Sequence, residues 1–192
     1  MKPAAEPREE RNAFDEDARA LRALASGDIG ALGELYDRYA VSLLRFVRRS
    51  SSREDAEDVV QTTFLRVAAT AGRFDPTRAT ARSWIFGIAT HVLRERRRAW
   101  ARLASAMGRL LSETQASASP GGTVAAGASV DMGRALDRLS DAKRMAFVLV
   151  EVEGFTGEEA AAMLGIPLGT VWTRLHHARR ELRDLLGEKV GT

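Results

Sequence analysis

The sequence predicts an all-α protein made of two small helical domains joined by a flexible linker, and three observations support this. Apolar residues recur at helical spacing along most of the chain, whereas no segment alternates apolar and polar residues as a half-buried strand would. Residues 112–129, rich in Ala, Ser and Gly and without an aromatic residue, interrupt this periodicity. The length of 192 residues leaves room for one ordinary domain or two small ones.

The composition excludes several classes of protein. Because the chain has no cysteine, it can form neither disulfides nor thiolate metal sites, and it has no Cys nucleophile. No apolar run approaches the roughly 20 residues that span a bilayer. Residues 1–11 are charged and lack the apolar core of a secretory signal. We therefore expect a cytoplasmic protein without membrane insertion.

The first domain is expected at residues 15–103, after a flexible N-terminal extension at residues 1–14. Four helices are predicted there, at about residues 15–26, 29–49, 53–71 and 81–103. Gly27 and Asp28 should end the first helix, and the run Ser50-Ser51-Ser52 should end the second and cap the third. Residues 72–80 form a loop around Pro76.

The third predicted helix has an acidic outer face. Its inward stripe consists of Ala56, Val60, Thr63, Phe64 and Val67. The residues left outside are Glu54, Glu57, Asp58, Gln61 and Thr62. Such a face is unsuited to nucleic acid but would fit a protein partner with a basic groove. The alternative is an ordinary solvated face with acidic residues at the helix N-terminus.

The fourth predicted helix has the opposite character, because five arginines and one glutamate lie between residues 94 and 102. Residues that can be buried on its other side are Trp84, Ile85, Ile88, Val92 and Leu93. His91, Arg94 and Arg98 share a stripe that could follow a phosphate backbone. In the preceding loop, Phe74 and Arg78 could hold an unpaired base, or Phe74 could instead cap the core.

The second domain is expected at residues 131–187, after a linker at 104–130 and before a tail at 188–192. Residues 156–159 have the form of a capping box, which begins a short helix. Gly165 should end that helix in the left-handed conformation, and Pro167 suits the first turn of the next helix. The buried stripe of the next helix is Val171, Leu175, Ala178, Leu182 and Leu185.

This arrangement is typical of a helix-turn-helix whose second helix enters the major groove. Other faces of that helix carry Thr170, Thr173, Arg174, His177 and Arg180. Arg174 is placed to read guanine, whereas Thr170 and Arg180 are better placed for phosphates. An ordinary helical hairpin with a solvated basic face is the alternative. No metal site is expected at His176 and His177, because adjacent helical residues point about 100° apart.

Three segments resemble parts of bacterial sigma factors. Residues 55–65, DAEDVVQTTFL, resemble the helix by which sigma factors grip the polymerase clamp. Residues 83–91, SWIFGIATH, resemble the next helix, which faces the −10 element, and residues 164–179, LGIPLGTVWTRLHHAR, resemble the −35-reading helix-turn-helix. The segments occur in the right order with the expected gap. Because the chain lacks room for further regions, it resembles the extracytoplasmic function (ECF) type of the sigma-70 family.

The resemblance implies a factor that directs core RNA polymerase to promoters in a stress or envelope response under an anti-sigma factor. Its two domains would be sigma region 2 and sigma region 4, which contact the β′ clamp and the β flap. The polymerase contacts would be Asp55, Asp58, Gln61, Thr62 and Leu65. The −10 residues would be Phe74, Arg78, Trp84, His91, Arg94, Arg97 and Arg98. The −35 residues would be Thr170, Trp172, Thr173, Arg174, His177 and Arg180.

Four positions depart from the family pattern. Thr62 stands where an acidic residue is common, Gly87 where Arg is frequent, His91 where Asn is frequent, and Trp172 where a basic residue is usual. The sequence predicts no catalytic residue, no cofactor and no small-molecule substrate. A stand-alone helix-turn-helix regulator is a second hypothesis, but no ligand-pocket signature or heptad seam supports it. An enzyme is a third, which the lack of a Gly-rich phosphate loop disfavours.

Overall fold

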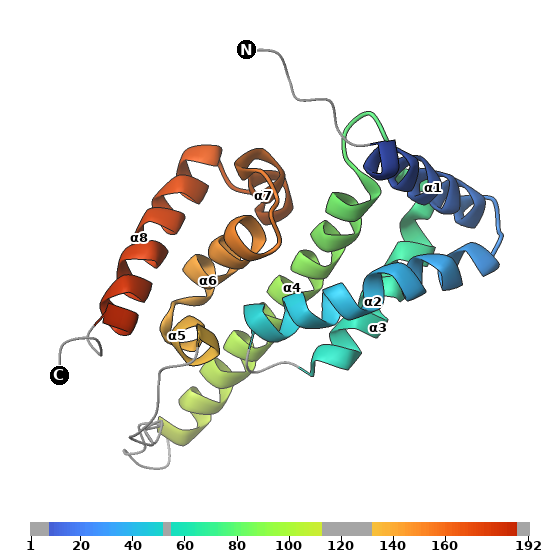
Figure 1. Ribbon diagram of the computed structural model, residues 1–192. Helices are drawn as coiled ribbons and strands as arrows, with labels where there is room; N and C mark the ends of the chain where they lie inside the picture. Colours follow the sequence, from blue (N-terminus) through green and yellow to red (C-terminus); the bar gives the residue numbers. More distant parts are fainter. Residues whose placement is uncertain (1–7, 52–54, 113–131, 188–192) are drawn as a thin grey trace.

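The computed structural model describes residues 8–51, 55–112 and 132–187, and in these residues it contains helices and turns but no strand (Figure 1). The first domain contains α1 (Arg8–Ala25), α2 (Gly30–Ser50), α3 (Ala56–Thr70), the 3-10 turn η1 (Ala71–Arg73) and α4 (Ala81–Ser112). The second contains α5 (Met132–Arg138), α6 (Asp141–Phe147), the π-helical turn η2 (Val148–Val152), α7 (Gly157–Leu164) and α8 (Leu168–Gly187). The all-α prediction is confirmed.

Two boundaries in the first domain differ from the prediction. α1 begins at Arg8, so half of the expected N-terminal extension is helical, and residues 1–7 lie outside the described part. The cap of α3 is Asp55 rather than the serine run, because the Asp55 carboxylate accepts the backbone N–H groups of Glu57 and Asp58. Ser51 instead ends α2, where its N–H donates to the carbonyl of Val47. At the N-cap of α3 a carboxylate such as that of Asp55 is favoured, because the N-terminus of a helix is electropositive.

α4 is longer than predicted. It continues from Leu103 to Ser112, so the first part of the expected linker, residues 104–112, is helical. Ala, Leu, Met and Arg are among the best helix formers, and this segment contains no proline to stop the helix. Around the point where the predicted helix was expected to end, Trp100, Leu103 and Met107 are exposed. The rest of the predicted linker lies outside the described residues.

The first domain closes around a core supplied by all four of its helices. Its fully buried large side chains are Leu21, Leu35, Leu43, Phe46, Val47, Val59, Ile85, Phe86 and Leu93. The rings of Phe46 and Phe86 lie 5.2 Å apart and join α2 to α4. The buried Asp17 carboxylate accepts hydrogen bonds from Tyr39 and Arg38 and so ties α1 to α2. Burial and this hydrogen bond to Asp17 raise the pKa of Tyr39.

The second domain has a smaller core beneath α8. Its buried residues include Leu136, Met145, Leu149, Val171 and Leu175. Arg144 is also buried, and its guanidinium donates to the carboxylate of Asp137 at 2.9 Å and to the carbonyl of Asp137 at 2.6 Å. These bonds hold α6 against the end of α5. The second domain lies alongside α4, and one continuous cluster of buried residues extends across both domains (Figure 1).

Candidate polymerase and DNA interfaces

The predicted polymerase-docking residues lie on the outer side of α3. Gln61 and Leu65 are exposed and four residues apart, so they share one helix face, and Leu65 is 64% exposed. Asp58 is also exposed, but its carboxylate is paired with Arg96 of α4 at 2.6 Å. Arg96 additionally donates to the hydroxyl of Thr62 at 3.1 Å. The charge of Asp58 on this face is therefore partly neutralised, and Leu65, one turn after Gln61, is an exposed apolar group beside it.

Asp55 caps the N-terminus of α3, a structural role that the sequence alone did not distinguish from a role in polymerase docking. Its carboxylate accepts from the N–H of Glu57 at 3.1 Å and of Asp58 at 3.3 Å. Both bonds are made within the first turn of α3. A substitution of Asp55 would therefore loosen the helix that presents Gln61 and Leu65, whatever Asp55 itself contacts.

The loop before α4 is ordered by its own hydrogen bonds. The Asp75 carboxylate accepts the N–H of Thr77 at 2.9 Å and its hydroxyl at 2.7 Å. These bonds lower the pKa of Asp75. Phe74 is half-buried, and its ring lies 5.5 Å from that of Trp84 at a tilt of 59°. Phe74 thus packs at the edge of the core beside Trp84, while Arg78 stays exposed.

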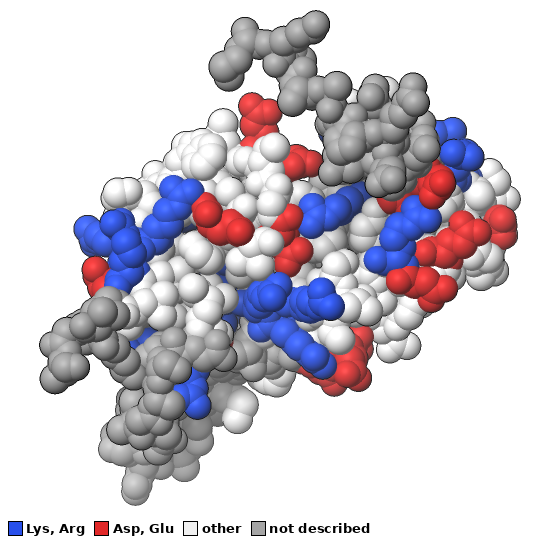
Figure 2. Space-filling view, in the orientation of Figure 1, with Lys and Arg blue, Asp and Glu red and all other residues white. Residues whose placement is uncertain are grey.

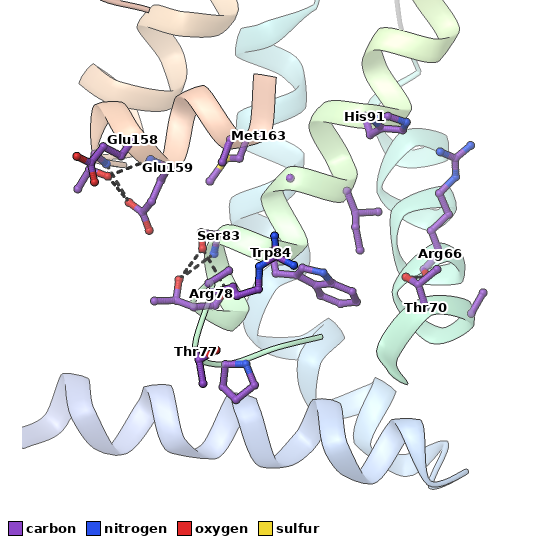
Figure 3. A pocket seen from close by; sticks show the side chains of 18 residues that line it. Arg66, Thr70, Thr77, Arg78, Ser83, Trp84, His91, Glu158, Glu159 and Met163 are labelled. Carbon is purple, nitrogen blue, oxygen red and sulfur yellow. Dashed lines mark hydrogen bonds between the residues drawn. The ribbon is translucent and has the colours of Figure 1, made fainter. Parts of the chain in front are cut away.

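A cavity of about 880 Å³ opens beside this loop (Figure 3). The first domain contributes to its wall Arg66, Thr77, Arg78, Ser83, Trp84, Gly87 and His91. The second domain contributes Glu158, Glu159 and Met163 from α7. Four of the predicted −10 positions lie in or next to this cavity, so the structure gathers Phe74, Arg78, Trp84 and His91 at one place.

The predicted basic stripe on α4 is divided between two environments. His91 and Arg98 are exposed, and the His91 ring nitrogen Nε2 lies 3.4 Å from Glu95. Arg94 instead donates to the carbonyl of Leu164 in the second domain at 2.5 Å. Arg97 donates to the carbonyl of Ser50 at 2.7 Å and lies 3.3 Å from the Asp141 carboxylate. Arg94 of the stripe and its neighbour Arg97 therefore face protein, whereas His91 and Arg98 face solvent.

Charge on the face of the molecule shown in Figure 2 is mixed in sign. On the face shown in Figure 2, the Lys and Arg side chains gather in separate groups with Asp and Glu between them. A face on which positive and negative groups alternate gives little long-range attraction for nucleic acid.

The helix-turn-helix signals are all confirmed. The Thr156 hydroxyl accepts the N–H of Glu159 at 3.1 Å, and the Glu159 carboxylate accepts the N–H of Thr156 at 2.9 Å. Gly165 ends α7 with φ 60° and ψ 43°, a left-handed conformation that favours glycine. α8 begins at Leu168, immediately after Pro167.

The predicted −35 residues lie on the outer sides of α8. Trp172, Thr173 and Arg180 are exposed, while Thr170, Arg174 and His177 are half-buried. The buried stripe comprises Val171, Leu175, Ala178 and Leu182, with Leu185 half-buried. The indole of Trp172 rests against Gly157 at the start of α7. The Trp172 side chain thus packs against α7 while 47% of the residue remains exposed to solvent.

Sequence reasoning missed the residues that join the two domains. Arg82 and Glu153 lie 71 positions apart, and the guanidinium of Arg82 donates to the carbonyl of Glu153 at 2.8 Å. No local pattern marks either residue, because an arginine at the start of a helix is ordinarily solvated. Neither a group of three metal-ligating side chains nor a helix able to cross a membrane occurs in the part of the chain that the structure describes.

Comparisons with known proteins agree with both domains. The family model for sigma-70 region 2 matches residues 35–102, and that for sigma-70 region 4 matches residues 129–182. ECF RNA polymerase sigma factor SigL of Mycobacterium tuberculosis is 32% identical over 174 residues, which cover 85% of this chain and 93% of that protein. SigE of Mycolicibacterium smegmatis is 34% identical over 173 residues, which are 85% of this chain but 66% of that protein.

Solved structures show the same architecture. The sigma factor CnrH, whose sequence from Cupriavidus metallidurans is 32% identical to this chain, has been solved with the cytosolic domain of CnrY. That structure gives a TM-score of 0.63 with 30% identity and covers 91% of this chain and 99% of that chain. RpoE of Bartonella quintana, solved with the anti-sigma factor NepR, gives a TM-score of 0.57 with 27% identity and covers 81% and 98%.

A region 2 bundle followed by a region 4 helix-turn-helix defines a transcription initiation factor of the sigma-70 class. Together with its relatives, this shows that the chain belongs to the ECF RNA polymerase sigma factors. It is therefore a sigma factor and not an enzyme: it binds core RNA polymerase and promoter DNA, and it directs where transcription begins.

Proposed function

We propose that Gln61 and Leu65 on α3 form the centre of the contact with the β′ clamp, with Asp58 and Thr62 at its edge. The observation that carries this proposal is the exposure of Leu65, which leaves 64% of an apolar side chain uncovered beside an exposed amide on one helix face. An exposed apolar residue flanked by polar ones is typical of a protein interface. Region 4 is proposed to rest on the β flap.

The docking proposal is tested by gel filtration of core RNA polymerase with the purified protein. Leu65→Glu combined with Gln61→Ala should abolish co-elution, because it places an uncompensated charge at the centre of the contact. Both residues are exposed, so the fold should be unaffected. Ile29→Glu is the matched control, since Ile29 is 76% exposed outside α3. Unchanged co-elution of the double variant would remove this assignment.

We propose that the loop residues Phe74 and Arg78, with Trp84 and His91 of α4, read the −10 element as a partly unpaired strand. Aromatic rings and an arginine at the mouth of a cavity suit stacking with an unpaired base. The −35 element is read by α8, with Arg174 at a base edge and Thr170, Trp172, Thr173, His177 and Arg180 around it.

We also propose that an anti-sigma factor controls this protein in the cytoplasm, in a stress or envelope response. Support comes from the related structures, in which CnrH is bound to the cytosolic domain of CnrY and RpoE to the anti-sigma factor NepR.

A further inference from the structure

α4 carries an exposed apolar stripe on the turns that follow its last core residue, Leu93. Trp100, Leu103 and Met107 are each at least half exposed. They are spaced three and four residues apart, so they lie on one side of the helix together with the exposed Ala104. This is the spacing of apolar residues in helices that pair with another helix. The stripe could not be recognised from the sequence, because the helix was expected to end at Leu103.

The opposite side of the same segment is basic. Arg98 and Arg102 are exposed, and each lies two residues from Trp100, which places it about 160° away from the indole around the helix axis. His91 lies nine residues before Trp100 and so belongs to this basic side as well. Nucleic acid that follows the arginines would therefore not meet the apolar stripe. The stripe is left for a protein.

A cavity of about 780 Å³ adjoins the stripe, between α4 and the turn that joins α5 to α6. The α4 wall of this cavity is formed by Trp100, Ala101 and Ala104, and the opposite wall includes Asp137, Leu139 and Asp141. The stripe is thus one side of a groove. A groove with an apolar wall suits an amphipathic helix. It does not suit a flat lipid surface, which an amphipathic helix meets with an open face.

Charge in this groove matches a second copy of the same segment. The side chains of Asp137 and Asp141 are at least half exposed, whereas Arg144 and Arg97, which pair with them, are far less exposed. The groove therefore offers an apolar wall and two accessible carboxylates. Its complement is a helix with an apolar stripe and arginines on the other side, and residues 98–107 of another copy have this composition. The carboxylates would offset the repulsion between two arginine-bearing helices.

We propose that the free protein forms a symmetric dimer in which the ends of two α4 helices pack antiparallel along this stripe. A twofold axis brings the stripe against its own copy, with Leu103 and Ala104 at the axis and Trp100 of one copy near Met107 of the other. The paired segment, residues 100–107, is about 12 Å long, so the dimer is weak and forms as the concentration rises. The basic side of α4 remains uncovered in it.

The test is sedimentation velocity of the purified full-length protein over a range of concentrations. The wild type should pass from monomer to dimer as its concentration rises. Leu103→Glu should weaken dimerisation on the order of a thousandfold, because the carboxylate enters the contact from both copies. Ile29→Glu is the matched control and should dimerise like the wild type, since Ile29 is 76% exposed and lies at the α1–α2 turn, far from the end of α4 (Figure 1).

Three outcomes would overturn the dimer. A wild type that stays monomeric at every concentration would leave the stripe to a different protein. A Leu103→Glu variant that dimerises as tightly as the wild type would place the contact elsewhere. Association that disappears at high salt would be ionic, whereas a contact along an apolar stripe should persist because salt screens only the charges around it.

Disulfide cross-linking gives an independent measurement for the case that Leu103→Glu fails to fold, as judged by circular dichroism. The chain has no cysteine, so Ala104→Cys and Ser105→Cys each introduce a single thiol at an exposed position. Residue 104 lies at the twofold axis, whereas residue 105 points about 100° away from it. Mild oxidation should therefore link Ala104→Cys into a covalent dimer and leave Ser105→Cys largely monomeric, because a disulfide needs Cα atoms within about 7 Å. Equal yields from the two variants would overturn the antiparallel arrangement and with it the proposal.

Discussion

Trp172 of the recognition helix lies against Gly157, the first residue of α7, so closely that a Cβ atom on residue 157 would come within 2.7 Å of the indole Cζ2. The same atom would lie 3.0 Å from Leu168 Cδ1. A glycine at position 157 therefore fixes where the indole lies. Trp172 is 47% exposed and, with the exposed Thr173, lies at the start of the surface proposed to contact DNA.

Gly157→Ala should displace the Trp172 ring and destabilise region 4 by about 1–3 kcal/mol, the usual cost of an added methyl group in a filled space. In a background with Trp84 and Trp100 replaced by Phe, the indole should become more accessible to acrylamide. Gly169→Ala is the control, because a Cβ atom there meets nothing within 4 Å. Identical quenching in the two variants would show that Gly157 does not position the ring.

Thr156→Ala should lower the free energy of unfolding by about 1 kcal/mol, because it removes one half of the capping box. Urea denaturation followed by circular dichroism measures this change. Thr173→Ala serves as the control, since its hydroxyl bonds only to the carbonyl of Gly169 within α8. A loss of equal size in both variants would argue against a specific role for the cap.

Arg174→Ala should weaken promoter binding by the holoenzyme roughly tenfold to a hundredfold. The reason is the loss of one bidentate base contact, which contributes about 1–3 kcal/mol. Run-off transcription on promoters with an intact or a scrambled −35 element separates this loss from a general one. Arg183→Ala, exposed on the last turns of α8, is the control. If Arg174→Ala retained full dependence on the −35 sequence, another side chain would have to read it.

The phenol of Tyr39 should titrate well above the ordinary tyrosine pKa of about 10, because burial and the Asp17 carboxylate both disfavour its anion. The raised pKa means that the contribution of Tyr39 to stability is complete below pH ~10 and is lost as the pH rises through the folded-state value. The absorbance of tyrosinate at alkaline pH should show a late step that Tyr39→Phe removes and Tyr36→Phe leaves in place. A late step that survives Tyr39→Phe would contradict the assignment.

Features encoded by neighbouring residues could be predicted from the sequence. The capping box at Thr156, the left-handed Gly165 and the buried stripe from Val171 to Leu182 each depend on spacing within one or two helical turns, and all are present. The ends of α1 and α4 were predicted short, because nothing in their Ala-rich and Arg-rich flanks marks a stop or a start. The helix propensity of these flanking residues accounts for the longer α1 and α4.

The contacts between the domains could not be predicted, because they depend on partners distant in sequence. Arg94 was expected to face DNA from its place on a basic stripe, yet its partner is a carbonyl 70 residues away. Helical periodicity indicates which face of α4 is polar, but it does not distinguish a face that meets solvent from one that meets another domain. The cap at Asp55 was missed for a simpler reason, since the run Ser50-Ser51-Ser52 lies just before it and serine can cap a helix as well as aspartate.

The π-helical turn at Val148–Val152 separates two carboxylates that lie two residues apart. The N–H of Glu153 donates to the carbonyl of Val148 at 2.9 Å, five residues back, so this turn holds one residue more than an α-helical turn. Glu151 therefore points to Arg179 and Glu153 to Arg49 and Arg82. Deleting one residue from this turn would rotate the residues that follow it by about 100° around the helix axis. We expect such a deletion to separate Glu153 from Arg49 and Arg82 and so to loosen the contact between the two domains.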